Sequence, residues 1–224
     1  MKRIPTAEFL DNDAGTEAEV ADSLLDLRWF NRWFGGITTT RKMIQRVAGC
    51  SGRKSFSFLE VAAGSGYVPH SARKALRKGG IQLDVTLLDR AASHLSNGGR
   101  SIVGDALALP FRDTSFDLVG CGLFAHHLSP EQLVRFVNEA LRVSRCAVLI
   151  NDLIRHPAHL ALVYAGVPLY RSRITRHDAA ASVLQAYTPD EMREILGRTA
   201  AARVEIGRSY LFRMGVIAWK AGAL

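Results

Sequence analysis

Apolar and polar residues along this chain follow two different periods, and the change from one period to the other predicts helices and strands in alternation. Apolar residues recur at helical spacing from Glu17 to Phe34, where Gly35-Gly36 is expected to end the helix. A second, shorter helix is expected at about residues 40–48. Farther along, strands are predicted at 56–61, 82–89, 101–104, 116–121 and 147–153, with helices at 67–78 and 130–143.

Two helix starts carry a local signature of their own. Ser129-Pro130-Glu131-Gln132 and Thr188-Pro189-Asp190-Glu191 are capping boxes with proline at the first helical position. The last apolar runs, at 203–206 and 210–220, predict an antiparallel hairpin. Strands and helices that alternate in this way form a doubly wound α/β sheet, mostly parallel, with helices on both faces. Ligands of such sheets bind at the carboxyl ends of the strands.

The first predicted strand runs into a loop of small residues, which is the most informative part of the chain. Glu60 lies near the end of the strand, and Ala62-Ala63-Gly64-Ser65-Gly66 follows it. Small residues let the backbone approach a ligand closely, and the helix that starts at Tyr67 points its first amides at the loop. Asp89 ends the next strand, 23 residues after Gly66, where a carboxylate can bind a ribose diol. The pattern predicts a nucleotide-like ligand; a tight connection that binds nothing is the alternative.

The ligand is not expected to be a dinucleotide, because Pro69 replaces the third glycine of that fingerprint. Two further motifs follow in order: Gly104-Asp105-Ala106 with Leu109-Pro110-Phe111 after it, and then the apolar strand that begins at Phe116. With these motifs, residues 56–150 resemble the class I S-adenosylmethionine-dependent methyltransferases. The resemblance is to the small-molecule branch, which includes the ubiquinone and menaquinone biosynthesis enzymes.

This resemblance implies a Rossmann-like sheet of seven strands, with S-adenosyl-L-methionine as cofactor and S-adenosyl-L-homocysteine as product. By the same resemblance, the loop after Glu60 holds the amino acid end of the cofactor, Asp89 the ribose, and Asp105 the adenine. The implied cofactor-binding residues are Glu60, Ala62, Gly64, Gly66, Asp89, Arg90, Asp105, Ala106, Cys121 and Gly122. Ala62 departs from the family, which usually has glycine there. Alanine at a positive φ would be strained by about 1 kcal/mol.

The net charge of +8 and the pI of about 9.8 raise the question of a nucleic-acid partner. The basic residues are dispersed, apart from a denser patch at 171–177, and no basic tail is present. Enzymes of this fold that methylate base amines carry an Asn or Asp, two prolines and an aromatic residue after the fourth strand. Gly120-Cys121-Gly122-Leu123-Phe124 stands there instead, so a nucleic-acid partner is not expected.

The chain is expected to be a cytoplasmic protein, monomeric or homodimeric. It has neither an apolar signal region near its start nor an apolar run of about 18 residues that could span a membrane. Cys50, Cys121 and Cys146 lack metal-ligand spacing and are expected to be reduced core thiols. We expect an N-terminal helical arm over residues 1–50 and a Rossmann-like domain over 51–224, with a substrate lid inserted at about 155–187.

The lid insertion carries the candidate substrate-binding residues. Apolar and cationic side chains mix in it, which suits a hydrophobic, acidic or phenolic small molecule; a solvated basic lid helix is the alternative. The candidates are Asp152, Arg155, Tyr164, Tyr170 and Arg173. In the aromatic segment 29–34, Asn31 or Arg32 could contact the cofactor carboxylate, or the segment could only pack against the sheet.

Methyl transfer requires an aligned nucleophile and, for a hydroxyl or an acidic carbon, a proton acceptor. His126, His127 and His177 are the candidate bases, because imidazoles titrate near neutral pH. Adjacent histidines usually point apart, so at most one of His126 and His127 is expected to face the substrate. No third ligand with suitable spacing accompanies them, and no metal site is expected.

The sequence as a whole predicts an S-adenosylmethionine-dependent methyltransferase that acts on an oxygen or carbon of a small, aromatic or polyketide-like acceptor. Two alternatives stay open. The first is an RNA methyltransferase that binds RNA through the basic patch at 171–177. The second is a non-catalytic, cofactor-binding partner subunit, which the substitution at Ala62 and the lack of an unmistakable base would favour.

Overall fold

The apolar runs of the chain form one sheet of seven strands, in the order β3-β2-β1-β4-β5-β7-β6. The computed structural model describes residues 1–12, 14–92, 95 and 100–223. Neighbouring strands are parallel from β3 to β5, whereas β7 is antiparallel to both β5 and β6. The predicted doubly wound, Rossmann-like sheet with its closing hairpin is therefore confirmed. The strands are β1 Ser55–Val61, β2 Gln82–Asp89, β3 Arg100–Val103, β4 Phe116–Gly122, β5 Ser144–Leu153, β6 Arg203–Tyr210 and β7 Arg213–Trp219.

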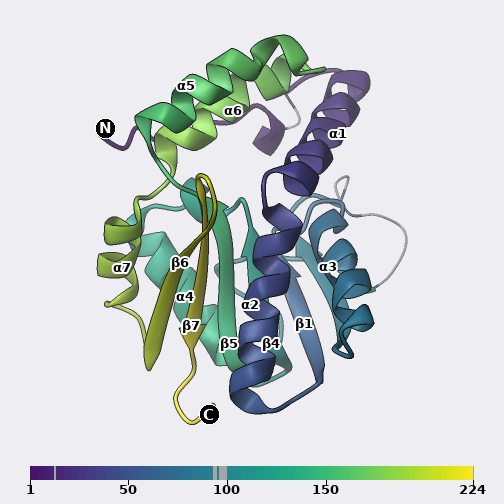
Figure 1. The fold of residues 1–224 in the computed structure, drawn as a ribbon, viewed down its shortest axis with the longest axis vertical. Coiled ribbons are helices and arrows are strands. Elements are labelled where there is room, and N and C mark those ends of the chain that lie inside the picture. Colours follow the sequence, from purple (N-terminus) through teal and green to yellow (C-terminus); the bar gives the residue numbers. More distant parts are fainter. Residues whose placement is uncertain (13, 93–94, 96–99, 224) are drawn as a thin grey trace.

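Helices cover both faces of the sheet, and a hydrophobic core fills each interface. On one face lie α2 (Gly36–Ser51) and α3 (Tyr67–Lys78), and on the other lie α4 (Pro130–Val143) and α7 (Pro189–Leu196) (Figure 1). Phe136 of α4 and Phe58 of β1, on opposite faces, are both fully buried. Two cores on one sheet make it a rigid platform for the loops at its strand ends.

A third group of helices stands over one end of the sheet rather than on a face (Figure 1). It consists of α1 (Glu17–Trp33), α5 (Pro157–Gly166) and α6 (Arg173–Gln185). Hydrogen bonds from the start of α6 and the residues before it tie α6 to α1: Asp26 accepts the amide of Arg171 at 2.9 Å. The first residues of the chain, which we call the strap (residues 1–12), run along α6 (Figure 1). Among the described residues, no helix is both long and apolar enough to cross a membrane.

Several element boundaries differ from the sequence prediction for local reasons. The helix predicted at about 40–48 already begins at Gly36, because Gly35 takes a left-handed conformation (φ 82°) that ends α1 and starts α2 at once. Tyr210 belongs to the first strand of the hairpin, β6, and not to the second. The arm boundary expected at residue 50 falls at the end of α2, which packs on the sheet through Ile44 and Val47.

The local capping signals are confirmed. Ser129 and Thr188 each cap their helix through a reciprocal capping box, with proline in the first turn. A third box, at Thr16 and Glu19, starts α1. Cys121 and Cys146 are buried free thiols, and Cys50 is half-buried.

Candidate active site

A cavity of about 490 Å³ lies where the loops after β1, β2, β3 and β4 meet the strap and α1. Its volume is in the range of cofactor and ligand pockets. The sheet side of the wall consists of these four loops, and the cover, formed by the strap and α1, contributes polar and apolar side chains to the opposite wall. The lining includes Glu60, Ala62, Gly64, Asp89, Arg90, Asp105, Ala106, Gly122 and His127 from the sheet side, and Glu8, Asp11, Leu27, Arg28 and Asn31 from the cover.

The loop after β1 holds a left-handed conformation at three positions. Ala62 has φ 52°, Gly64 has φ 49° and Gly66 has φ 66°. The amide of Ala63 donates to the carbonyl of Leu88 at 3.1 Å, which ties the loop to β2. Alanine at a positive φ is strained by about 1 kcal/mol. Glycine at position 62 would therefore adopt this loop conformation more easily than Ala62 does.

Glu60 is a buried acid that has room beside it. The residue is 4% exposed, and no described group donates a hydrogen bond to its carboxylate. A Cβ on Gly120 or Gly122 would approach the carboxylate oxygens to 3.1 and 3.4 Å, so these two glycines leave the space that it occupies. Burial raises the pKa of Glu60 to about 8. An unpaired buried carboxyl at the wall of a cavity is suited to binding a cationic ligand group.

Asp89 fixes the shape of two loops at the edge of the cavity. Its two carboxylate oxygens accept the amides of Gly64 at 2.8 Å and of Ala91 at 3.0 Å. Each oxygen retains a further lone pair for a ligand hydroxyl. Asp105 is exposed and accepts the amide of Leu107 at 2.8 Å, so its turn presents the backbone of Ala106 to the cavity.

Two of the implied cofactor residues do not line the cavity. Cys121 points into the core and is 2% exposed, and burial raises the pKa of its thiol well above the usual value. Gly66 acts through its backbone, because a Cβ there would lie 2.5 Å from Leu87 while φ is positive. Gly66 thereby caps α3 and turns its first amides toward the loop.

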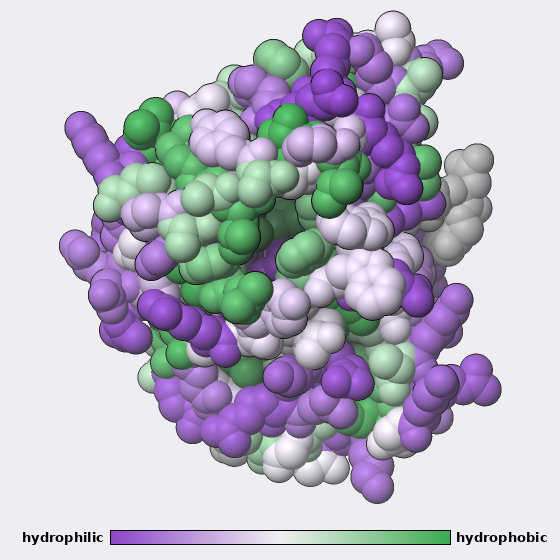
Figure 2. All heavy atoms as spheres, turned by 45° about the horizontal axis from the view of Figure 1, so that its top comes forward, coloured by the Kyte–Doolittle hydropathy of each residue, from purple (hydrophilic) through white to green (hydrophobic). Residues whose placement is uncertain are grey.

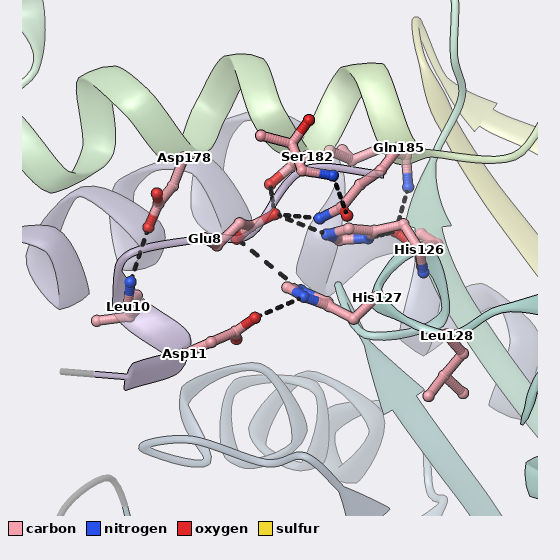
Figure 3. A network of polar contacts seen from close by, with 12 residues as sticks. Glu8, Leu10, Asp11, His126, His127, Leu128, Asp178, Ser182 and Gln185 are labelled. Carbon is pink, nitrogen blue, oxygen red and sulfur yellow. Dashed lines mark hydrogen bonds and ion pairs between the residues drawn. The ribbon is translucent and has the colours of Figure 1, made fainter. Parts of the chain in front are cut away.

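The two adjacent histidines do not point apart, contrary to the prediction. His126 and His127 lie in a 3-10 turn (η3, Ala125–His127), and their ring centroids are 4.3 Å apart. Both Nε2 atoms approach the carboxylate of Glu8, at 3.4 and 3.9 Å (Figure 3). Both rings therefore lie on the side of the turn that faces the strap.

His126 is poorly suited to the role of base. Burial acts to lower its pKa, but the charge of Asp152, a 2.6 Å hydrogen bond to it and the Glu8 carboxylate together raise that pKa to about 10. The imidazole is therefore already protonated at neutral pH. His127 is half-buried, lines the cavity, and pairs with Asp11 through Nδ1 at 3.0 Å.

Glu8 is the site residue that sequence reasoning missed. It is 8% exposed, and Ser182 and Gln185 of α6 donate to it at 2.6 and 2.8 Å. Burial raises its pKa, but hydrogen bonding and attraction to the histidines outweigh burial and lower it. No spacing rule connects position 8 with positions 126 and 127, so only the fold brings them together (Figure 3).

His177 does not reach the cavity. Its ring stacks on Phe9 at 4.0 Å, and its Nδ1 lies 2.8 Å from Asp178. Asp178 in turn accepts the amides of Phe9 and Leu10 at 2.9 and 3.0 Å. This pair anchors the strap to α6, which corrects its prediction as a base.

The predicted substrate residues are mostly structural in this arrangement. Asp152 is buried beneath His126, and Arg155 is buried with hydrogen bonds to the carbonyls of Met1 and Ala186. The Tyr170 hydroxyl donates to Val163, and Arg173 pairs with Glu19 on the surface. Tyr164 is 57% exposed on α5 and does not line the cavity.

Within segment 29–34, one of the two polar candidates lines the cavity and the other does not. Asn31 lines the cavity and accepts a 3.3 Å hydrogen bond from Arg213. Arg32 stacks on Trp33 and does not line the cavity. Arg28, one turn earlier on α1, is a cavity cation that the sequence reading did not single out.

An apolar opening lies above the site. Figure 2 shows a hollow in the upper face, rimmed largely by hydrophobic and weakly polar residues. The covering helices and the β6–β7 hairpin carry most of the large exposed apolar side chains. The ring of Phe34, after α1, contacts the ring of Tyr210, in the hairpin, edge to face. These side chains include Trp29, Trp33, Phe34, Leu162, Tyr164, Leu169, Tyr210 and Leu211.

Comparison with known proteins agrees with this architecture. Residues 59–146 match the family model described as a methyltransferase domain. Curated proteins yield no match to the chain. Among solved structures, the plantazolicin methyltransferase BamL, crystallised with a triazolic desmethylPZN analog and SAH, shares 15% identity with a TM-score of 0.67, over 88% of this chain and 90% of its own.

Two further structures are similar over most of their length. The plantazolicin methyltransferase BpumL, crystallised with a monoazolic desmethylPZN analog and SAH, has 15% identity and a TM-score of 0.65, covering 94% of this chain and 91% of its own. A SAM-dependent methyltransferase from Aquifex aeolicus has 17% identity and a TM-score of 0.51, covering 78% and 88%. Residues 59–146 thus match the methyltransferase domain family model, and the chain has the fold of the class I S-adenosylmethionine-dependent methyltransferases.

Proposed function

We propose that this protein is a methyltransferase that uses S-adenosyl-L-methionine to methylate an oxygen or carbon of a small hydrophobic acceptor. The observation that carries the proposal is Glu60, a buried acid without a partner beside the glycine-rich loop. A buried carboxylate is stable only when a cation or hydrogen-bond donors accompany it. The ammonium group of an amino acid ligand meets that need.

The remaining lining fits the other parts of this cofactor. The amides of the loop after β1 suit its carboxylate, and Asp89 has lone pairs directed toward a ribose diol. The turn at Asp105-Ala106 offers a surface to the adenine. When bound, S-adenosyl-L-methionine supplies an electrophilic methyl group on its sulfonium.

The chain's own contribution to catalysis is position, exclusion of water and proton acceptance. The strap and α1 cover the cavity, and Leu24 and Leu27 line its roof. His127 is our candidate proton acceptor, because it lines the cavity and is not locked to Asp152 as His126 is.

The apolar rim above the site supports a hydrophobic acceptor (Figure 2). It is consistent with the azole-containing desmethylPZN analogs bound by the two plantazolicin methyltransferases. The basic patch gives little support to RNA, because Arg171 and Arg173 pair with Asp26 and Glu19.

Calorimetry tests the cofactor site directly. We expect S-adenosyl-L-methionine and S-adenosyl-L-homocysteine to bind the wild type with one site, and Glu60→Gln to weaken binding by at least about tenfold while the protein stays folded. Glu194→Gln, an exposed acid on α7, is the matched control and should bind as the wild type does. Absence of binding to the wild type would overturn the proposal. Binding without turnover on a panel of phenols and azoles would favour the partner subunit instead.

A further inference from the structure

Three side chains from two distant segments converge on one point in the wall of the cavity. Glu8 of the strap lies with one carboxylate oxygen 3.4 Å from His126 Nε2 and the other 3.9 Å from His127 Nε2 (Figure 3). All three potential ligand atoms lie within 4.8 Å of one another. Two imidazoles and one carboxylate are the donor set of many catalytic metal sites.

The separations are close to those that a metal ion requires. With metal–ligand bonds of about 2.0–2.2 Å in tetrahedral geometry, ligand atoms lie about 3.4 Å apart. The separations of 3.4 and 3.9 Å run to two different oxygens of Glu8, and all three potential ligand atoms lie within 4.8 Å of one another, so ligation by a single Glu8 oxygen requires the side chains to move together by about 1 Å. The oxygen of Glu8 that faces His127 is the better ligand, because Ser182 and Gln185 already donate to the other.

Each histidine is oriented by a carboxylate on its opposite nitrogen. His126 Nδ1 lies 2.6 Å from Asp152, and His127 Nδ1 lies 3.0 Å from Asp11. Metal-binding histidines are commonly held in this way, with Nδ1 bound to an acid and Nε2 directed at the metal. Here both rings share that orientation, and both Nε2 atoms face the same carboxylate.

His126 Nε2 has no well-formed hydrogen bond among the described residues, although its side chain is only 2% exposed, and its one charged neighbour there is the Glu8 carboxylate at 3.4 Å. Buried polar nitrogens are rarely left in this state. The charges around it also favour a cation. Glu8, Asp11 and Asp152 surround two imidazoles, so the group carries three negative charges when the rings are neutral, and a divalent ion that displaces the proton from His126 Nε2 would offset two of them.

We propose that Glu8, His126 and His127 form a binding site for a divalent transition-metal ion of the Zn²⁺ type, on the wall of the cavity that also contains Glu60. Three protein ligands leave at least one coordination position open toward the cavity. If the proposed function is correct, an acceptor oxygen can occupy this position and lose its proton more readily, and in that metal-bound form His127 is a ligand and not the proton acceptor. Metal binding itself does not depend on that function.

The structure also explains why sequence spacing does not reveal this site. No metal site is expected from the sequence, because the two histidines have no third ligand near them in the chain. Glu8 is 118 positions before His126 and reaches it only because the strap is held along α6. The third ligand is thus a product of tertiary structure.

Titration with Co²⁺ tests the proposal without relying on activity. The full chain, freed of metal by a chelator, should bind one Co²⁺ per protein with visible absorption bands of low-symmetry coordination, and Zn²⁺ should displace it. Glu8→Gln and His127→Ala should each weaken binding by at least about tenfold, and Asp11→Asn by a smaller factor. His70→Ala, a histidine on α3 away from the strap, should bind as the wild type does.

The variants avoid the buried ring of His126, and circular dichroism should show each of them folded. Failure of the folded wild type to bind Co²⁺ and Zn²⁺ at micromolar concentrations would overturn the metal site. Equal loss of binding in His70→Ala would do the same. Calorimetry of S-adenosyl-L-methionine binding in excess chelator separates the two proposals, because cofactor binding can persist when metal binding fails.

Discussion

Asp152 accepts two hydrogen bonds from His126, one from its backbone amide at 3.0 Å and one from its imidazole Nδ1 at 2.6 Å. The acid lies at the carboxyl end of β5 and the histidine in the turn after β4, so the pair fixes the turn to the sheet. Both side chains are 2% exposed. Burial raises the pKa of Asp152, but the charge of His126 and the hydrogen bonds from His126 and the Leu153 amide together outweigh burial and lower it.

Removing this acid should destabilise the metal-free protein strongly. Asp152→Asn leaves a buried imidazolium without its closest counter-charge, which should reduce the free energy of unfolding by about 3–5 kcal/mol. Urea denaturation at neutral pH measures the change. Asp84→Asn removes the exposed partner of Arg100 and should cost less than about 1 kcal/mol. Equal losses in the two variants would contradict the role given to Asp152.

Cofactor binding should release a proton below the pKa of Glu60. Since burial raises that pKa to about 8, the unliganded carboxyl is protonated at pH 7 and must ionise to pair with an ammonium. Affinity should rise by up to about tenfold per pH unit between about pH 6 and 7.5. Calorimetry in buffers of different ionisation enthalpy counts the proton. Glu60→Gln should bind the cofactor weakly, with an affinity that no longer depends on pH in this range. Cofactor binding to the wild type without release of a proton would contradict the prediction.

The same carboxyl should make the unliganded protein less stable as pH rises. The folded-state pKa of Glu60 is raised from 4.5 to about 8, so between these values the folded state binds more protons than the unfolded state. Its free energy of unfolding therefore falls across this window, by several kcal/mol at most. Thermal denaturation of wild type and Glu60→Gln at about pH 5 and 8 should show the variant gaining relative stability at the higher pH.

Glycine at position 62 should improve the loop. Ala62→Gly removes the strain of a positive φ and should raise the free energy of unfolding by up to about 1 kcal/mol without weakening cofactor binding. Ala62→Val places a β-branched side chain in the same conformation and should lower both the free energy of unfolding and the affinity for the cofactor. A loss of stability in the glycine variant, measured by denaturant titration, would show that Ala62 is not strained.

Arg155 should act on stability and not on ligand affinity. Its guanidinium donates to the carbonyls of Met1 and Ala186 and pairs with Glu191, away from the cavity. Arg155→Gln should lower the free energy of unfolding by about 3 kcal/mol and leave cofactor affinity unchanged. Arg193→Gln, on the exposed face of α7, should change neither. An altered cofactor affinity in folded Arg155→Gln would show that Arg155 contributes to ligand binding.

Local patterns predicted the fold well because its elements depend on neighbours in sequence. The capping boxes at Ser129 and Thr188 and the loop after Glu60 combine signals within four to nine residues. Glycine after a buried strand allows a tight loop whose backbone can approach a ligand, whatever the rest of the fold. The cavity wall on the sheet side could therefore be predicted from the sequence. Gly35-Gly36 correctly predicted the end of α1, but the start of α2 at Gly36 was not predicted, because a glycine pair indicates where a helix stops and not that the next helix begins at once.

The cover of the site could not be predicted, because it is built from contacts across most of the chain. Glu8 has no signal of its own, and Arg155 looked like a substrate cation until its three partners were known. Tertiary burial also changed the chemistry of His126, whose pKa depends on Asp152 rather than on residue type.

The strap differs from the rest of the molecule in how it is held. It lies outside the sheet, and side chains such as Arg3, Glu8 and Asp178 make most of its connections to α6 and the η3 turn. Such a segment can detach while the two cores stay intact, at a small part of the free energy of global unfolding. Opening of the cavity then requires only detachment of the strap, so ligands can exchange on a faster timescale than that on which the sheet itself opens.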